Sequence, residues 1–404
     1  MIVLARVSGS AALPGSQRGR YRGRYRGRYR GNYDATQVLG SLRCVSSAVS
    51  IALEALPKPT RAFGSDNQSG VHPDVMEALR QANTGHAVGY GSDRWTDAAV
   101  EAFRKRFGRE TAVLFTWNGS GANVLSLASL LPRWGGVLCP TSSHIDVDED
   151  GAPEAFLGAK IIGVPTVDQK LLPSQIDQAM IGAFSPHHVT PRAISITQST
   201  ETGTLYSVDE IGALCEAAHR HGLFVHVDGA RIANATSALG ADVRDSTFAL
   251  GVDALSFGGT KNAMMYGEAV LLRRPEHALG GEMLRKQTTQ LASKMRFIGA
   301  QFEAILRHDL WLKTAGHANS MATRLAAAVV GIAGVEGIGS VAVNSVYPTL
   351  PRDVIEPLQA WCQHYTWDAH QNQVRWVCSW DTTIEDVDRF AAGVRAACAA
   401  AGPA

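Results

Sequence analysis

The chain has 404 residues, of which 45% are hydrophobic and 19% are charged, and its formal net charge is +1. The apolar content excludes a disordered chain, and the absence of a Gly-X-Y period excludes a collagen-like one. No run of about 18 uncharged apolar residues occurs, so the sequence predicts no membrane-spanning helix. Six scattered cysteines without a CxxC pair indicate reduced thiols and a cytoplasmic protein.

Positive charge is concentrated at the start of the chain. Residues 1–60 contain ten basic and two acidic residues, whereas the remainder contains 28 basic and 35 acidic ones. Residues 18–31 repeat Arg-Gly-Arg-Tyr, and the mutual repulsion of these arginines predicts a disordered basic leader over residues 1–60. The leader could be an RNA-binding arm or a repeat expansion without function. The acidic body favours the second interpretation, so we expect no nucleic-acid partner.

Helical and strand patterns alternate from residue 71 to residue 272. Pro73 and Asp74 suit the start of a helix, and apolar residues recur at helical spacing over residues 95–107. Further helical stretches cover residues 122–131 and 208–221, and the short apolar runs that suit buried strands are residues 111–115, 136–139, 160–164, 192–197, 223–227, 254–257 and 268–272. This alternation predicts an α/β fold over residues 61–310, in which a mainly parallel sheet lies between two layers of helices.

The pattern changes after residue 310. We expect helices at residues 317–332, 353–364 and 384–400, and short strands at residues 340–347, 366–369 and 373–380. Residues 311–404 are therefore predicted to form a smaller α+β domain.

Residues that follow the strands are the candidates for function, because parallel sheets bind ligands at the carboxyl ends of their strands. Gly119 and Ser120 follow the first strand and begin a helix, an arrangement that favours an anion such as phosphate. A dinucleotide fingerprint is excluded, since Val124 stands at its last glycine position. Acidic residues at 146–150 resemble a calcium loop, but Leu157 stands where its bidentate Glu is needed, so we predict no metal site. His144 remains a candidate after the second strand.

Two further strand ends carry charged residues. Asp228 could cap the next helix, pair with Arg231 or hold a cationic ring nitrogen. Lys261 lies among small residues after the strand at 254–257, a setting that suits an amine forming a Schiff base. A phosphate-type turn, a flat His144 side chain, an aspartate and a lysine are together the parts that hold pyridoxal 5'-phosphate (PLP).

At these positions the sequence resembles the L-threonine aldolases, which are PLP-dependent enzymes of fold type I (aspartate-aminotransferase-like). The resemblance runs from about residue 63 to residue 394. It is carried by Phe63-Gly-Ser-Asp-Asn, Tyr90-Gly-Ser-Asp, Asn118-Gly-Ser-Gly-Ala-Asn, His226-Val-Asp-Gly-Ala-Arg, Phe257-Gly-Gly-Thr-Lys-Asn, Leu291-Ala-Ser-Lys-Met-Arg and Arg375-Trp-Val-Cys-Ser-Trp. It implies a fold-type-I enzyme that works as a homodimer or homotetramer with shared active sites, to which Tyr90 and residues 294–296 contribute.

The resemblance also implies a role for individual residues. Lys261 corresponds to the Schiff-base lysine, Asp228 to the partner of the pyridine nitrogen and His144 to the histidine stacked on the ring. Gly119 and Ser120 correspond to the phosphate cradle. The substrate carboxylate is expected to be bound by Ser65, Arg231 and Arg375, and an arginine fork suits that task because it grips a carboxylate through two N–H groups.

Two positions depart from the family pattern. Ala263 stands where the family usually has glycine, an exchange that matters if the backbone there has a positive φ. Glu201 stands where another branch has a histidine, so the catalytic base could be His144, Glu201 or a water held by either.

The resemblance implies a PLP-dependent carbon–carbon lyase that cleaves L-threonine, L-allo-threonine and related β-hydroxy-α-amino acids to glycine and an aldehyde. The alternatives are another PLP-dependent reaction, such as phenylserine aldol cleavage, β-elimination or racemisation. The presence of Asp228, Lys261 and Arg375 together disfavours a catalytically idle scaffold.

Overall fold

The computed structural model describes residues 47–278 and 280–402, and the larger of its two lobes is built on a seven-stranded sheet. The strands are β1 (Ala112–Thr116), β2 (Gly135–Pro140), β3 (Lys160–Val164), β4 (Thr190–Thr197), β5 (Phe224–Gly229), β6 (Ala254–Gly258) and β7 (Glu268–Leu272). They lie in the order β1-β7-β6-β5-β4-β2-β3, and every neighbouring pair is parallel except the two that β7 makes. The mainly parallel α/β sheet predicted from the sequence is confirmed.

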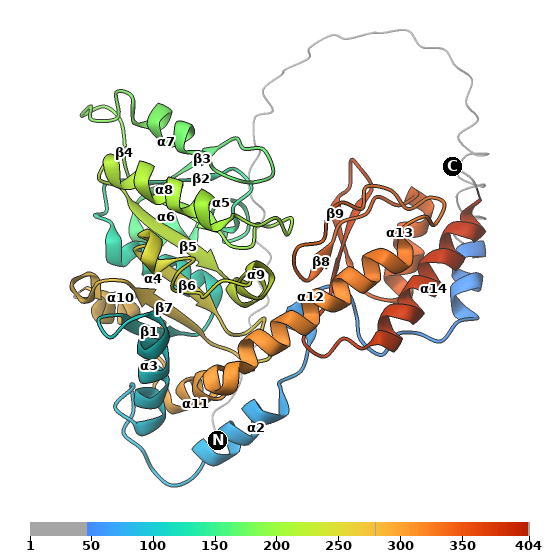
Figure 1. Cartoon of the computed structure of the whole chain (residues 1–404), viewed down its shortest axis with the longest axis horizontal. Coiled ribbons are helices and arrows are strands. Elements are labelled where there is room, and N and C mark those ends of the chain that lie inside the picture. Colours follow the sequence, from blue (N-terminus) through green and yellow to red (C-terminus); the bar gives the residue numbers. More distant parts are fainter. Residues whose placement is uncertain (1–46, 279, 403–404) are drawn as a thin grey trace, which may run out of the picture. The chain divides into compact units, whose positions relative to one another are not determined.

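Helices pack on both faces of this sheet (Figure 1). They are α2 (Pro73–Ala82), α3 (Arg94–Phe107), α4 (Gly119–Leu130), α5 (His144–Val147), α6 (Ala152–Leu157), α7 (Pro173–Met180), α8 (Val208–Arg220), α9 (Ile232–Leu239), α10 (Gly281–Gln287) and α11 (Arg296–Leu306), with short 3₁₀ turns η1 (Asp66–Gln68), η2 (Phe248–Leu250), η3 (Pro275–Ala278) and η4 (Arg307–Asp309). Within the described ranges, no helix is long and apolar enough to cross a membrane.

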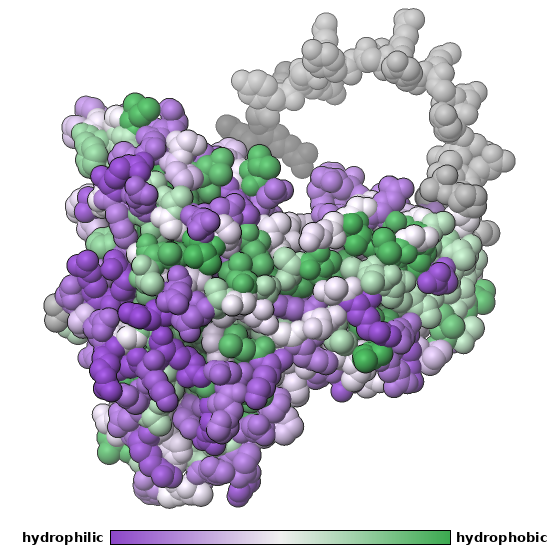
Figure 2. Space-filling view, viewed as in Figure 1, coloured by the Kyte–Doolittle hydropathy of each residue, from purple (hydrophilic) through white to green (hydrophobic). Residues whose placement is uncertain are grey.

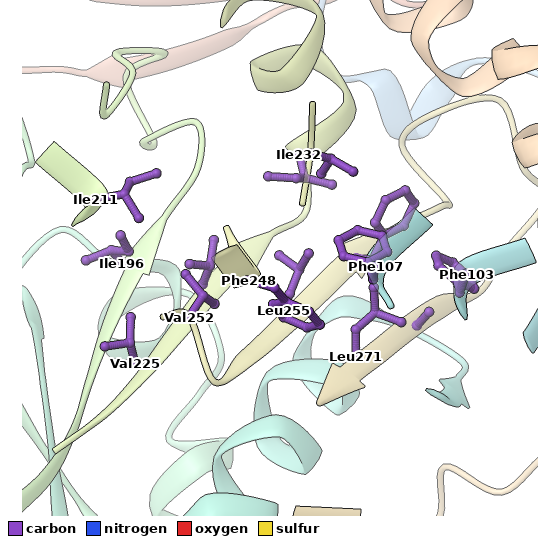
Figure 3. Close-up of a cluster of buried hydrophobic side chains, with 14 of the residues drawn as sticks. Phe103, Phe107, Ile196, Ile211, Val225, Ile232, Phe248, Val252, Leu255 and Leu271 are labelled. Carbon is purple, nitrogen blue, oxygen red and sulfur yellow. The ribbon is translucent and has the colours of Figure 1, made fainter. Parts of the chain in front are cut away.

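The strands alternate their side chains between two apolar layers. On β7, Leu271 joins the cluster that contains Phe103 and Phe107 of α3, whereas Val270 joins the cluster beneath α4. Figure 3 shows the first of these clusters, with aromatic residues of α3 packed over strand residues such as Leu255. Burial on both faces explains why the strands read as continuous apolar runs in the sequence.

A second lobe is formed by the C-terminal residues together with a helical segment at residues 47–54. Its elements are α12 (Leu310–Val329), β8 (Ser345–Val346), α13 (Arg352–Trp361), β9 (Tyr365–Asp368), β10 (Gln373–Val377) and α14 (Ile384–Ala401), with the strands in the order β8-β10-β9. The predicted disordered leader is wrong over residues 47–60, because Val49 and Leu53 are buried in this lobe. The Arg-Gly-Arg-Tyr repeat lies outside the described residues.

Helix α12 contributes to the cores of both lobes. Trp311 and Ala315 belong to the larger cluster, whereas Leu325 and Val329 belong to the cluster of the second lobe. On the face shown in Figure 2, hydrophobic residues gather over the region of α12 and α14, both of which are rich in alanine. The boundary predicted at residue 310 therefore falls at the start of a helix that the two lobes share.

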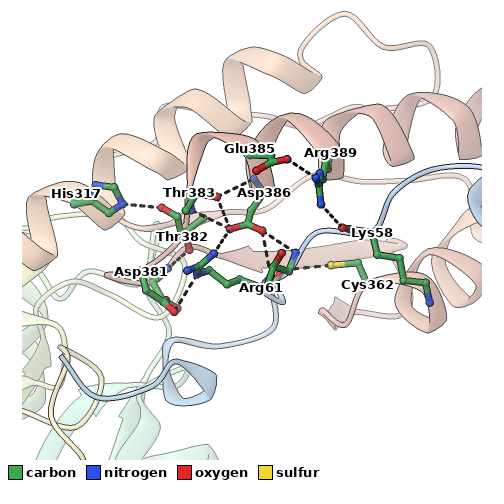
Figure 4. A network of polar contacts seen from close by, with 12 residues as sticks. Lys58, Arg61, His317, Cys362, Asp381, Thr382, Thr383, Glu385, Asp386 and Arg389 are labelled. Carbon is green, nitrogen blue, oxygen red and sulfur yellow. Dashed lines mark hydrogen bonds and ion pairs between the residues drawn. The ribbon is translucent and has the colours of Figure 1, made fainter. Parts of the chain in front are cut away.

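A polar network fixes the chain segment that leads into the site (Figure 4). Arg61 forms ion pairs with Asp381 at 3.1 Å and Asp386 at 3.0 Å, and Asp386 also accepts hydrogen bonds from Thr383 at the start of α14. Burial raises the pKa of Asp386, but these hydrogen bonds outweigh burial and hold the pKa below its usual range. The network anchors residues 60–61 and so places Ser65 and Asp66, which follow directly.

Candidate active site

Seven of the nine candidate residues line one cavity at the carboxyl ends of the parallel strands. They are Gly119, Ser120, His144, Glu201, Asp228, Arg231 and Lys261. They lie at or a few residues after the ends of five strands, β1, β2, β4, β5 and β6, which all end at this edge of the sheet. The remaining two candidates, Ser65 and Arg375, are not part of the cavity lining. They lie beside one another in the chain fold, because Arg375 donates a hydrogen bond to the carbonyl of Gly64, the residue before Ser65.

Lys261 is placed by a turn that tolerates only small residues. A Cβ on Gly258 would collide with the backbone of Ala230, and a Cβ on Gly259 would collide with that of Gly267. Burial lowers the pKa of Lys261, and the nearby Arg231 guanidinium lowers it further. The amine makes no hydrogen bond or ion pair with any residue in the described part of the chain. It is therefore available as a nucleophile.

Asp228, at the end of β5, is a buried carboxylate held by two donors. Its Oδ1 accepts the N–H of Ala230 at 2.9 Å, and its Oδ2 accepts the side-chain amide of Asn123 at 2.9 Å. The same amide of Asn123 donates to Glu149 at 2.8 Å. The position of Asp228 is thus fixed from both sides.

His144 lies at the start of α5, and its side chain is oriented by Glu149. The imidazole Nδ1 lies 2.9 Å from Oε1 of Glu149, whose side chain is buried. This hydrogen bond raises the pKa of His144. Asn123 and Glu149 therefore connect His144 to Asp228, although neither was among the site residues predicted from the sequence. The signal was present, because Asn123 ends the glycine-rich motif and Glu149 lies five residues after His144.

Glu201 lies in the same cavity, close to the backbone of His144. Its Oε1 accepts the N–H of His144 at 3.0 Å and the hydroxyl of Thr197 at 2.8 Å. Burial raises the pKa of Glu201 more than these hydrogen bonds lower it. A carboxylate with a raised pKa is a stronger proton acceptor than an exposed one.

Gly119 and Ser120 are the first two residues of α4, where backbone N–H groups have no intrahelical acceptor. The preceding Asn118 caps the helix by accepting the N–H of Gly121 at 2.8 Å. A Cβ on Gly119 would meet no atom within 4 Å, so the space beside it is open. Helix N-termini favour anions, and this one faces the cavity that contains Lys261 and Asp228.

The two arginines that were predicted to bind a carboxylate differ in their partners. Arg231 is engaged by Asp66, to which its Nε donates at 2.7 Å and its Nη2 at 2.9 Å. Arg375 donates only a long hydrogen bond of 3.4 Å to the carbonyl of Gly64, and its buried Nε has no partner in the part of the chain described. Ser65 is buried next to Asp66 and donates its hydroxyl to Oδ1 of Asp66 at 3.4 Å. Asp66, for which no role was predicted from the sequence, thus connects Ser65 with Arg231.

Residues 62–348 match the model of a protein family described as beta-eliminating lyase. The chain belongs to this family. Among relatives of this lyase, the low specificity L-threonine aldolase of Pseudomonas aeruginosa is 40% identical over 337 residues, which cover 83% of this chain and 97% of that protein. The predicted resemblance to L-threonine aldolases is therefore confirmed.

Solved structures are similar to the lyase over most of its length. The threonine aldolase of Leishmania major superposes with a TM-score of 0.77 at 28% identity and covers 82% of this chain and 97% of that one. The Oryza sativa protein TDC, solved with PLP and tryptamine, superposes with a TM-score of 0.66 at 16% identity, covers 89% and 87%, and so shares the fold. The lyase thus has the fold-type-I architecture expected from the sequence.

Ala263 has a φ of +72°, so the position requires the conformation that glycine adopts most easily. Changing Ala263 to glycine relieves about 1–2 kcal/mol of left-handed strain. It loses about 0.8 kcal/mol from the buried methyl group and about 0.5–1 kcal/mol through backbone entropy. We therefore expect Ala263→Gly to change the free energy of unfolding of the lyase by less than about 1 kcal/mol, measured by urea denaturation.

The matched control is Ala254→Gly, which removes an equally buried methyl group from β6, where no strain is relieved. It should lower the free energy of unfolding by about 1–2 kcal/mol. Equal losses of unfolding free energy in the two variants would show that the positive φ of Ala263 causes no strain.

Glu268 is a buried carboxyl group on β7 that supports the lysine turn of the lyase, because its Oε2 accepts the N–H of Gly259 at 2.6 Å. Burial raises its pKa to about 7, from 4.5. The folded state therefore binds this proton more tightly than the unfolded state. The resulting stabilisation is complete below about pH 4.5 and is lost as the pH rises through 7.

The expected size of this effect is about 3 kcal/mol. It is measured as the difference between the wild type and Glu268→Gln in the free energy of urea unfolding between pH 4.5 and 7.5. Glutamine retains an acceptor for Gly259 but does not titrate, so the wild type should lose stability relative to the variant over this range. A difference independent of pH would mean that Glu268 has an ordinary pKa.

Proposed function

We propose that this lyase is a PLP-dependent aldolase that cleaves L-threonine, L-allo-threonine and related β-hydroxy-α-amino acids to glycine and an aldehyde. The observation that carries the proposal is the single cavity in which Lys261, Asp228 and the N-terminus of α4 meet. The names of its relatives support the reaction, since the similar proteins of Pseudomonas aeruginosa and Leishmania major are threonine aldolases.

The residues of the cavity fit PLP group by group. Lys261 would hold the aldehyde carbon, Asp228 the ring nitrogen, His144 one face of the ring, and Gly119 and Ser120 the phosphate. The open space beside Gly119 and the lowered pKa of the Lys261 amine support this assignment. PLP, when bound, supplies a sink for the electrons that the breaking Cα–Cβ bond releases.

The substrate would be oriented by its carboxylate. Arg375 is the principal anchor in this proposal because it donates only one long hydrogen bond, whereas Asp66 already occupies two donors of Arg231. Ser65, buried beside Asp66, adds a hydroxyl group. Fixing the carboxylate and the amino group restricts rotation about Cα and so selects which bond breaks.

Two groups could accept the proton of the substrate β-hydroxyl. His144 holds its Nδ1 against Glu149, which leaves Nε2 as an acceptor when the ring is neutral. Glu201 is a carboxylate whose pKa is raised by burial. A well-placed base raises kcat by about 10²–10⁴-fold. The variants His144→Phe and Glu201→Gln therefore identify the base, because only the variant that removes it should lower kcat by that amount.

The proposed function is tested with the purified full chain after incubation with PLP. Threonine should give glycine and acetaldehyde in equal amounts, and borohydride reduction should fix the cofactor on Lys261. Pyruvate and ammonia from serine, without acetaldehyde from threonine, would instead identify a β-eliminating enzyme. Labelling of a lysine other than Lys261 would overturn the assignment of the site.

We also propose that the lyase works in the cytoplasm as a homodimer or homotetramer whose sites are shared between subunits. The five cysteines of the described residues are all free and buried, which fits a reducing compartment. Tyr90, expected to reach a neighbouring site, is exposed with a φ of +62° and lies 5.5 Å from the ammonium of Lys286. Size-exclusion chromatography with light scattering checks the oligomeric state.

A further inference from the structure

The strand pair that holds Arg375 contains a β-bulge at Trp367. In the antiparallel pair of β9 and β10, Arg375 lies opposite Tyr365 and Val374 lies opposite Thr366, but Gln373 lies opposite Asp368. Trp367 is therefore an extra residue without a partner in the ladder. Bulges of this kind re-aim a side chain and are over-represented next to active sites.

The two aromatic residues of β9 contact the Arg375 guanidinium. Its Cζ atom lies 5.4 Å from the ring centroid of Tyr365 and 5.4 Å from that of Trp367. Both distances are within the range in which a guanidinium is attracted to an aromatic ring. Among the described residues no acidic group forms an ion pair with Arg375, so these rings are the main groups that hold its cation in place.

An aromatic ring holds a guanidinium without using its N–H donors. Asp66, by contrast, holds Arg231 through two of that guanidinium's N–H groups, which leaves fewer for a ligand. We propose that Tyr365 and Trp367 are positioning residues that hold Arg375 while leaving its donors free for the carboxylate of an amino acid. This inference rests on the proposed function, because it assumes that Arg375 binds the substrate carboxylate.

Trp367 is itself fixed by a contact with the other side of the site. Its ring packs edge-on against Tyr347, with centroids 5.3 Å apart. The Tyr347 hydroxyl donates to the backbone carbonyl of Glu201. Tyr365 is 42% exposed and packs against no other aromatic ring among the described residues, so Trp367 is the stronger of the two positioning residues.

The test compares Trp367→Leu with Trp134→Leu in the PLP-loaded enzyme. Trp134 is a matched control, since it is 65% exposed, lies 5.8 Å from the guanidinium of Arg192, does not line the cavity and precedes β2, at the opposite end of that strand from the cavity. Trp367→Leu should raise KM for threonine roughly five- to tenfold, with kcat changed less than about twofold. Trp367→Phe should restore most of the loss, and Trp134→Leu should leave both constants unchanged.

The role of the carboxylate is tested by equilibrium binding, followed by the visible absorbance of the cofactor. Trp367→Leu should weaken binding of glycine roughly five- to tenfold but change binding of 2-aminoethanol, which lacks the carboxylate, less than about twofold. In an Arg375→Ala background, Trp367→Leu should have no further effect on glycine binding, because the cation that the ring contacts is absent.

Equal weakening for glycine and 2-aminoethanol, or additive losses in the double variant, would overturn the positioning role and leave Trp367 a packing residue. Failure of the proposed function would be distinguishable, because the wild type would then neither bind glycine at the cofactor nor cleave threonine. Thermal unfolding of each variant checks that the second lobe remains folded.

Discussion

Replacement of Asp228 by asparagine is expected to lower kcat/KM for threonine cleavage by about 10²–10³-fold. Asparagine has nearly the same shape and can still accept the N–H of Ala230, but it carries no charge. With PLP bound as proposed, the uncharged side chain would no longer stabilise a protonated ring nitrogen, and the ring would be a poorer electron sink. Steady-state kinetics with saturating PLP measure the loss.

Asp253→Asn is the control for this experiment. Asp253 is also a buried carboxylate, but it pairs with Arg273 at 2.6 Å and accepts the N–H of Val225 at 3.0 Å, and it does not line the cavity. Its replacement should lower the free energy of unfolding while kcat/KM of the folded enzyme stays within about twofold. If Asp228→Asn also retained full kcat/KM, Asp228 would not be the partner of the ring nitrogen.

The second large effect is expected for Arg375→Ala. Loss of a charge-assisted grip on a desolvated carboxylate costs about 2–5 kcal/mol, which corresponds to roughly 30- to 5,000-fold in kcat/KM. Arg375→Lys should recover only part of this loss, because an ammonium is a point charge and cannot form the two parallel hydrogen bonds of a guanidinium. Competition by glycine and by 2-aminoethanol then shows whether the loss depends on the carboxylate.

Arg324→Ala provides the matched control. Arg324 lies in the same lobe but is solvent-exposed and paired with Asp388 at 2.8 Å, so its removal should change kcat/KM less than about twofold. If the Arg375→Ala enzyme kept its kcat/KM for threonine, the substrate carboxylate would be bound by Arg231 and not by Arg375.

The strands of the large sheet were predictable because a strand that is buried on both faces consists of consecutive apolar residues, which are visible in the sequence as short apolar runs. The predicted ranges 160–164 and 268–272 coincide with β3 and β7. The second lobe was less predictable. Residues 340–347 were predicted to form a strand, yet only Ser345 and Val346 pair with β10. Asn344 instead directs its side chain to Asp66 and to the carbonyl of Cys378, and such long-range contacts leave no local pattern.

Which residues meet in the cavity was predictable where they stand at strand ends with recognisable neighbours, as Lys261 and Asp228 do. Residues that hold another side chain in place were not predicted. Asp66 and Glu149 act through Arg231 and His144, and Glu149 was set aside with the rejected calcium loop. The helix at residues 47–54 was missed for a different reason, because the strong positive charge that precedes it dominated the interpretation of the whole leader.

Because α12 supplies side chains to two hydrophobic clusters, the lobes cannot be separated into independently folding fragments by cutting the chain between residues 310 and 311. The fragment ending at residue 310 would lack Trp311 and would expose the surface against which that indole packs. A chimera that combines the lobes of two relatives should therefore fold only when the whole of α12 comes from one relative and the surface of the other lobe that contacts α12 is kept. The continuous helix therefore makes the folding of the second lobe depend on the core of the first.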